Sequence, residues 1–337
     1  MNQRDARRLA AVFLLCIVAG CASFWIARWM ARRSQNEPVV VNPTPTQTRP
    51  RRVVTRPSLA PVFTPTPSKT DSVALALQKL DKAALLEHAQ HLSGSIGPRL
   101  AGTRAERRAA DYIEAQFRAY GYAPQREDFI TKKGGRSCNV IARRALPGQR
   151  QIVVGAHFDS VRVAPGANDN ASGVAVLLEL ARVLANEKTP VRFIAFGAEE
   201  RWEKQYLVKA HRLNGSNQHV SGLGDEKRLI KAMISLDMVG FGSVLQIGTL
   251  PGSGAGSKKL AQALETQARA LKLPVEKFQT PPWSDHVAFA RAGVPAVWVW
   301  WCRDRLFHTA RDGVQRVNPE KMRAVARVLL RYLMTNN

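Results

Sequence analysis

Residues 151–170 contain three side chains that could bind a metal ion or orient a residue that does: His157, Asp159 and Asp169. They follow the apolar run 152–154, and in α/β proteins such a buried strand commonly ends in the loop that carries the chemistry. Imidazole nitrogens and carboxylate oxygens both bind zinc, and a second carboxylate often orients a ligating histidine through its other ring nitrogen. In isolation this spacing is equally typical of a chance pairing on a loop, so further ligands must come from elsewhere in the chain.

The same arrangement recurs further along the chain, where side chains of metal-ligand types follow apolar runs. They are Glu199 and Glu200 after residues 191–196, Asp237 after 232–236, and His308 beyond 296–300. Because the carboxyl ends of parallel strands share one sheet edge, these distant side chains can converge. One nitrogen ligand with carboxylates around each of two metal ions suits zinc. Each residue alone has an ordinary structural explanation, and only the repeated pattern predicts a metal centre.

The elements that must position these side chains alternate between helical and strand patterns. Helices are expected at about 72–91, 104–120, 174–185, 257–271, 287–292 and 319–332, and strands at about 125–131, 138–142, 151–156, 191–196, 230–238, 275–279 and 296–300. Strands that alternate with helices in this way predict a three-layer α/β/α sandwich around a mostly parallel mixed sheet.

The N-terminal part of the chain is predicted to bring it to a membrane. Residues 1–33 contain an uncharged apolar run, 9–26, with basic residues on both sides. Residues 18–21, VAGC, resemble the lipobox of bacterial lipoproteins, whereas the apolar residues after them are typical of an uncleaved signal anchor, and both fates stay open. The Pro- and Thr-rich residues 34–70 predict an extended linker to a catalytic domain at 71–337. A tethered domain of this kind is expected in the periplasm or outside the cell.

The formal net charge of +24 suits contact with anionic membrane surfaces or cell-wall polymers. Residues 1–70 contain eleven Lys and Arg against Asp5 and Glu37, which gives +9 and leaves +15 for the remainder. The globular part has no zinc-finger spacing, no RNA-binding aromatic signature and no sustained basic block, so a nucleic-acid partner is not expected.

Catalysis by a cysteine or serine nucleophile is not indicated. Two of the four cysteines lie in the apolar N-terminal run, and Cys138 and Cys302 could form one disulfide or remain two buried thiols. The chain has no Cys-x-x-Cys motif, and no Gly-x-Ser-x-Gly elbow surrounds Ser160 or Ser172.

Ordered motifs across residues 75–335 resemble the co-catalytic di-zinc aminopeptidases of the bacterial leucyl aminopeptidase type, whose relatives include glutaminyl cyclases. The motifs are AHFDS (156–160), GANDNASG (166–173), FGAEE (196–200), LDMVG (236–240), SDH (284–286) with GVPA (293–296), and FHT (307–309). Upstream, GPRLAG (97–102) is similar to the entry segment of that family. The resemblance implies the zinc-dependent exopeptidase fold and a peptide substrate.

The resemblance also implies a role for each matching residue. Asp169 would bridge two zinc ions, His157 and Asp237 would complete one site, Glu200 and His308 the other, Glu199 would be the general base, and Asp159 would orient His157. Asp285 and His286 would line the pocket or support the ligands. The implied activity is hydrolysis of the N-terminal residue from peptides by a metal-bridging water that Glu199 activates.

Two other functions stay open at this stage. The first is a glutaminyl-cyclase-like aminoacyltransferase with a single zinc, and the aromatic residues 298–301 are what favours it. These residues could line a specificity pocket or pack in the core. The second is a non-catalytic binding domain, against which the complete ligand set argues. Residues 201–212 depart from the family pattern as an insertion beside the metal site, and His211 and His219 are expected at the surface.

Overall fold

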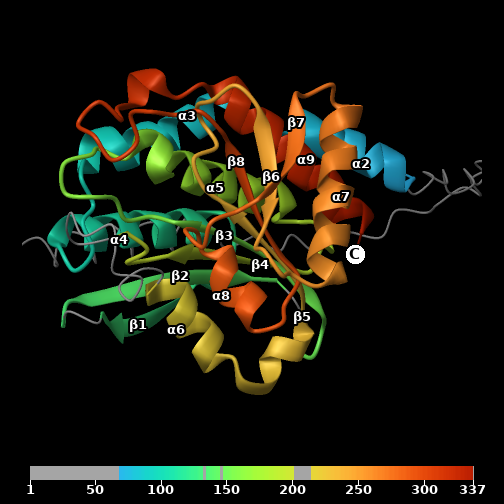
Figure 1. The fold of residues 1–337 in the computed structure, drawn as a ribbon, viewed down its shortest axis with the longest axis horizontal. Coiled ribbons are helices and arrows are strands. Elements are labelled where there is room, and N and C mark those ends of the chain that lie inside the picture. The colour runs from blue at the N-terminus through green and yellow to red at the C-terminus, as the bar shows by residue number, and fades with distance from the viewer. Residues whose placement is uncertain (1–67, 132–133, 145–146, 201–213, 337) are drawn as a thin grey trace, which may run out of the picture. The chain divides into compact units, whose positions relative to one another are not determined.

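The computed structural model describes residues 68–131, 134–144, 147–200 and 214–336. Within these ranges, eight strands form one sheet in the order β1-β2-β4-β3-β5-β8-β6-β7. Helices cover both faces of the sheet (Figure 1), so the predicted three-layer sandwich is confirmed. The predicted anchor at 1–33, most of the linker and the insertion at 201–212 lie outside the described residues.

The sheet is mixed, with a parallel centre. The strands are β1 Gln125–Ile130, β2 Arg136–Arg143, β3 Gln151–His157, β4 Val191–Phe196, β5 Ile230–Leu236, β6 Leu245–Thr249, β7 Val275–Gln279 and β8 Ala296–Trp301. Strands β4, β3, β5 and β8 are parallel neighbours, whereas β1 with β2, β2 with β4, and β6 with β8 pair antiparallel. The four parallel strands therefore end at one common edge.

The helices match the predicted ones at most positions. They are α2 Lys69–Gln78, α3 Lys82–Gln90, α4 Arg104–Ala119, α5 Ser172–Leu184, α6 Asn214–Gly222, α7 Ala255–Ala270, α8 His286–Arg291 and α9 Pro319–Thr335. The single helix expected at 72–91 is wrong, because the chain breaks at Leu80–Asp81. There the Asp81 side chain accepts a hydrogen bond from Ala83 N and starts a new helix.

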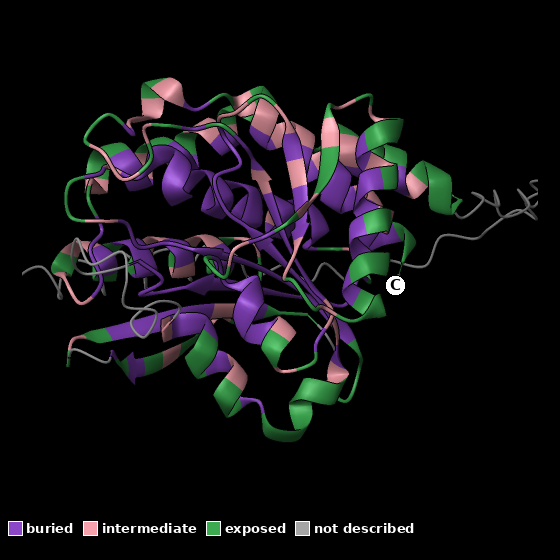
Figure 2. Ribbon diagram, viewed as in Figure 1, coloured by how far each residue is buried: buried purple, intermediate pink, exposed green. Residues whose placement is uncertain are grey.

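Alternation along the central strands divides the core between the two faces of the sheet. On β3, Val154 packs into the cluster beneath α3, α5 and α9, whereas Val153 packs on the opposite side with Phe289 of α8. Every residue of β3 is buried, and Figure 2 shows the same for the strands at the centre of the sheet. A strand covered on both faces has a mostly apolar sequence, and this explains why β3, β4 and β5 could be located from the sequence.

Cys138 and Cys302 are both buried free thiols, so the structure has two thiols and not a disulfide between them.

Among the described residues no helix is both long and apolar enough to cross a bilayer.

Candidate metal centre

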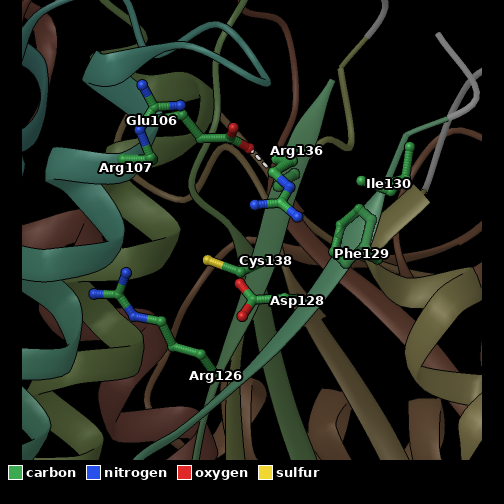
Figure 3. Close-up of a pocket in the computed structure, with 9 residues that line it drawn as sticks. Glu106, Arg107, Arg126, Asp128, Phe129, Ile130, Arg136 and Cys138 are labelled. Carbon is green, nitrogen blue, oxygen red and sulfur yellow. Dashed lines mark hydrogen bonds between the residues drawn. The ribbon is translucent and has the colours of Figure 1, made fainter. Parts of the chain in front are cut away.

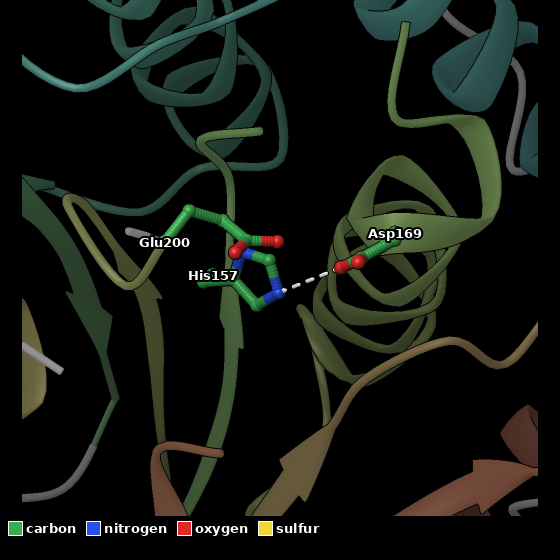
Figure 4. A group of neighbouring side chains, drawn as sticks. All are labelled: His157, Asp169 and Glu200. Carbon is green, nitrogen blue, oxygen red and sulfur yellow. Dashed lines mark ion pairs between the residues drawn. The ribbon is translucent and has the colours of Figure 1, made fainter. Parts of the chain in front are cut away.

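The common edge of the parallel strands gathers the predicted site residues. His157 is the last residue of β3, Glu199 and Glu200 follow β4, and Asp237 follows β5. Asp169 lies in the turn η2, Ala167–Ala171, just before α5, and His308 lies beyond β8. Figure 4 shows His157, Asp169 and Glu200, which arrive from three different elements and point toward one another.

Asp169 lies between the two histidines. Its Oδ1 is 3.2 Å from Nε2 of His157, and its Oδ2 is 3.1 Å from Nε2 of His308. Each half contains a further carboxylate, since Asp237 Oδ1 is 3.4 Å from Nε2 of His157 and Glu200 Oε1 is 2.8 Å from Nε2 of His308. The cluster thus consists of two imidazole–carboxylate pairs that share Asp169.

The cluster strongly favours positive charge. Burial lowers the pKa of His308, but the carboxylates of Glu200 and Asp169 outweigh this effect and raise the pKa to about 11. For His157, burial likewise lowers the pKa, yet Asp237 and Glu199 raise it well above its usual value. A field that holds protons on both imidazoles would also favour a divalent cation at the same place.

The donor set fits zinc. Glu200 Oε2 and Asp237 Oδ1 are buried and have no hydrogen-bond partner among the described residues. Buried carboxylate oxygens are normally hydrogen-bonded or bound to a metal, so these two atoms are available as ligands. Together with the two imidazoles they form the nitrogen and oxygen ligand set that zinc commonly takes.

The Asp169 turn is docked against the end of β5 by close backbone contact. Asn170 donates from Nδ2 to the carbonyl of Leu236 at 2.8 Å and accepts from the Met238 amide at 3.2 Å. At Gly173 an added Cβ would lie 2.5 Å from the Leu236 oxygen, so only glycine allows this approach. The contact sets the spacing between Asp169 and Asp237.

Asp159 lies behind the cluster and is fully buried. Its Oδ1 is 3.5 Å from Nδ1 of His157, which is the histidine that the resemblance implies it orients. In addition, Oδ1 accepts from the Glu199 amide at 3.0 Å and Oδ2 from the Glu200 amide at 2.9 Å. Asp159 therefore also holds the backbone of the two glutamates, a contact that the sequence did not predict.

A pocket of about 150 Å³ opens onto the cluster, and Glu199 lines it with the metal-ligand candidates. Its other lining residues include four aromatic ones, Trp283, Trp298, Trp300 and Phe307, together with Met238, Arg303 and Asp304. Trp298 and Trp300 stack with ring centroids 4.7 Å apart, while Trp301 packs into the main core. Both roles expected for residues 298–301 therefore occur, because two of the tryptophans line the pocket and one packs in the core.

Asp285 and His286 are buried behind these aromatic residues and do not line the pocket. His286 Nε2 is hydrogen-bonded to the Thr280 hydroxyl at 2.8 Å, and its ring stacks on Trp298. Burial lowers the pKa of His286 to about 3, so the ring is neutral and supports Trp298. Burial raises the pKa of the Asp285 carboxyl to about 7.

The surface position expected for His219 is wrong. The residue is buried on α6, with Nδ1 3.1 Å from the Glu127 carboxylate and its ring near Phe196 and Phe289. Its helix was not predicted, because a sequence rich in glycine, serine and asparagine has little helical propensity and no clear apolar period.

Sequence reasoning missed two buried groups that shape the site. Arg99 is completely buried and donates to the carbonyls of Leu92, Gly97, Phe158, Pro165 and Gly166. Asp312, also completely buried, accepts from the backbone of the Asp169 turn. Arg99 lies in the GPRLAG segment, residues 97–102, whereas nothing in the sequence pattern singled out Asp312.

A second cavity, of about 430 Å³, lies between α4 and the β1–β2 hairpin and contains none of the predicted site residues (Figure 3). Glu106 borders it and is itself buried, accepting from the Gly102 amide at 2.5 Å and the Ser137 hydroxyl at 2.6 Å. Its carboxylate also accepts from the backbone of Ala198, next to Glu199. Burial, and to a lesser extent the nearby Asp159, raises the pKa of Glu106 to about 8.

This pKa predicts a pH-dependent stability difference for Glu106→Gln. Between the ordinary carboxyl pKa of 4.5 and about 8, the folded chain retains a proton that the unfolded chain has released. Stability contributed by Glu106 therefore falls as pH rises through that window. Because glutamine does not titrate, the melting temperature of the variant relative to the parent should rise between pH 5 and pH 8. A constant difference across this pH range would contradict the assignment.

The model of peptidase family M28 matches residues 139–333. Aminopeptidase YwaD of Bacillus subtilis (strain 168) is 34% identical over 185 residues, which cover 51% of this chain but only 38% of the relative. Uncharacterized protein YfbL of Escherichia coli (strain K12) is 28% identical over 279 residues, covering 70% of this chain and 82% of that protein. The chain thus spans well under half of the YwaD sequence.

Solved structures share the fold. BSAP, a zinc aminopeptidase from Bacillus subtilis, superposes with a TM-score of 0.65 at 20% identity, over 74% of this chain and 93% of that structure. Glutaminyl cyclase from Porphyromonas gingivalis gives the same TM-score of 0.65 at 25% identity, over 76% and 98% of the two chains. The fold alone therefore does not distinguish a peptidase from a cyclase.

Proposed function

Since this chain belongs to peptidase family M28, we propose that it is a zinc-dependent aminopeptidase that hydrolyses the N-terminal residue from peptides. The observation that carries the proposal is the position of Asp169 between His157 and His308, with each of its oxygens facing one imidazole. This arrangement is the one expected of a carboxylate that bridges two metal ions.

The residues that would hold the metal ions follow from the two halves of the cluster. His157, Asp169 and Asp237 would hold one zinc ion, and Asp169, Glu200 and His308 would hold the other. Zinc bound in such sites lowers the pKa of water and polarises the scissile carbonyl. Asp159 would keep the ring of His157 oriented, because its Oδ1 lies near the nitrogen that faces away from Asp169.

Glu199 would act as the general base. It lines the pocket beside the metal-ligand candidates, its side chain is almost fully buried, and Asp159 fixes its backbone. A carboxylate in this position can take a proton from the attacking water and later return it to the leaving amine.

The pocket supports an exopeptidase that accepts one terminal residue. Its volume of about 150 Å³ is below the range of roughly 300–1,000 Å³ typical of ligand pockets, so it suits a single side chain. The carboxylates around it can attract the free ammonium group of a peptide N-terminus, and the tryptophans favour an apolar N-terminal side chain. We therefore expect large apolar residues to be released fastest.

The experiment that tests the proposal uses the full chain purified in detergent. We expect it to release free amino acids from aminoacyl-anilides, to lose this activity with a chelator and to regain it with zinc. The same anilides with an acetylated amine should not react, because the ammonium group is blocked. Equal hydrolysis of blocked and free substrates, or activity that resists metal removal, would contradict the proposal.

The exposed Trp283 provides a test of the pocket assignment. Its side chain is 51% exposed, so Trp283→Ala should leave the fold intact while removing apolar contact with the substrate. We expect KM for a leucyl-anilide to rise by roughly 10-fold with a smaller change in kcat. Leu75→Ala, which removes a similarly exposed apolar side chain on α2, is the matched control and should change neither constant. An unchanged KM in the tryptophan variant would place substrate elsewhere.

The proposed location is a membrane surface, with the catalytic domain in the periplasm or outside the cell. Support comes from the apolar run 9–26 and the Pro- and Thr-rich stretch that follows it. Anchoring could be by a retained helix or by acylation of Cys21. Fractionation of cells that express the chain with or without residues 1–33 tests this location. Only the form with residues 1–33 should be found in the membrane fraction, and finding both forms there, or neither, would contradict the proposal.

A further inference from the structure

Asp312 connects two segments that carry metal-ligand candidates. It follows His308 by four positions in the same loop, and its side chain reaches the turn that carries Asp169. Oδ1 accepts from the Asn168 amide at 2.9 Å and Oδ2 from the Asp169 amide at 3.1 Å. The Asp312 carbonyl also accepts from the Ala167 amide at 3.1 Å. One residue therefore holds three successive backbone N–H groups.

The contact repeats the arrangement at Asp159. That carboxylate binds the successive amides of Glu199 and Glu200, one with each oxygen. Two oxygens on two neighbouring N–H groups fix both the position and the tilt of the peptide, and hydrogen bonds to a charged acceptor are stronger than neutral ones. Each carboxylate thus immobilises one ligand-bearing segment from behind.

The loop between His308 and Asp312 is itself closed by local hydrogen bonds. The Asp312 amide donates to the carbonyl of Thr309 at 3.1 Å, and the Thr309 hydroxyl donates to the carbonyl of Leu306 at 2.6 Å. A second link runs in parallel, because Asn168 Nδ2 donates to Asp304 at 2.8 Å. A displacement of the Asp312 side chain would therefore change the separation of His308 and Asp169.

We propose that Asp312 is a positioning residue that sets the distance between His308 and Asp169 and thereby the affinity of their shared site for zinc. The inference rests on the proposed function, in which both residues are ligands. Asp312 would touch neither metal nor substrate, and yet it would determine metal affinity in addition to contributing to folding. Loss of a contact that orients a ligand typically weakens metal binding by about 10–100-fold.

The test is the zinc affinity of the full chain carrying Asp312→Asn, measured by competition with a chromophoric chelator. Asparagine offers one acceptor and turns an N–H group toward the other backbone amide, so one of the two hydrogen bonds is lost. We expect one of two zinc ions to bind about 10–100-fold more weakly, with the affinity for the other changed much less. Asp312→Glu keeps the charge but cannot place both oxygens on the same amides, and it should show the same selective loss.

Glu179→Gln is the matched control. Glu179 is an equally buried carboxylate on α5 that accepts from the Asp81 amide and from Arg182, on a helix face turned toward α3. This variant should melt at a lower temperature and bind both zinc ions with the parental affinity. If the Asp312 variants also lose thermal stability without any loss of zinc affinity, Asp312 is only a structural residue and the inference is wrong.

His308→Ala separates this failure from failure of the proposed function. If His308→Ala weakens zinc binding and both Asp312 variants do not, the ligand assignment stands and the positioning role is overturned. If His308→Ala leaves zinc binding unchanged, the ligand assignment fails and the positioning role fails with it.

Discussion

Replacing Glu199 by glutamine is expected to lower kcat by about 10²–10⁴-fold while leaving the zinc content unchanged. The substitution keeps the size of the side chain and the backbone hydrogen bond to Asp159, but glutamine cannot accept the proton of the attacking water. Since Glu199 is not among the proposed ligands, metal binding should persist. Kinetics on a leucyl-anilide, combined with metal analysis of the same preparation, measure both quantities.

The neighbouring Glu200 provides the contrast. Its Oε1 lies 2.8 Å from Nε2 of His308 and its Oε2 is buried without a hydrogen-bond partner among the described residues. Glu200→Gln should therefore reduce zinc affinity, and added zinc should restore part of the activity. Excess zinc should not rescue Glu199→Gln. If the two variants behave alike, the separation of base and ligand between these adjacent residues is wrong.

Asp169→Ala is expected to abolish the binding of both zinc ions and, with it, all hydrolysis. No other described residue faces both imidazoles at the distances found for Asp169, 3.2 Å and 3.1 Å. Its removal takes one ligand from each proposed site and leaves the two histidines without their shared carboxylate. Metal analysis after dialysis against a weak chelator measures the loss, and circular dichroism shows whether the variant is folded.

Asp237→Ala is the partial counterpart of this change. Asp237 faces only His157, so its loss should weaken one site and leave the half with Glu200 and His308 able to bind zinc. One ion retained in Asp237→Ala, against none in Asp169→Ala, is the result that supports a bridge. Retention of one ion in both variants would show that Asp169 serves a single site.

The part of the fold that holds the chemistry could be predicted from the sequence because burial on both faces leaves a clear signal. β3, β4 and β5 are short, mostly apolar segments, and His157, Glu199 and Asp237 stand at or just beyond their carboxyl ends. The rule that parallel strands share one edge then brings these residues together without any knowledge of distances. His308 was also placed after an apolar run, but a loop separates it from β8, and only the resemblance gave it a partner in Glu200.

Other features could not be predicted, because their cause is tertiary. The break at Asp81 has a local part, the cap that its side chain forms on Ala83 N, and a tertiary part, because Glu179, nearly a hundred positions away, accepts a hydrogen bond from the Asp81 amide. His219 is buried because Glu127 and Arg192 surround it, although its helix has a polar sequence. Asp312 and Asp159 act through backbone amides, and such contacts leave no pattern in side-chain spacing.

We propose that this chain is a two-zinc aminopeptidase and not a cyclase, although solved structures of both kinds share its fold. The most direct test is to determine zinc per chain and to identify, in the same preparation, the products formed from a peptide with N-terminal glutamine. The proposed function predicts two zinc ions, release of free glutamine and a peptide shortened by one residue. One zinc ion, with a peptide of unchanged length whose N-terminal glutamine has cyclised and released ammonia from its side-chain amide, would contradict it.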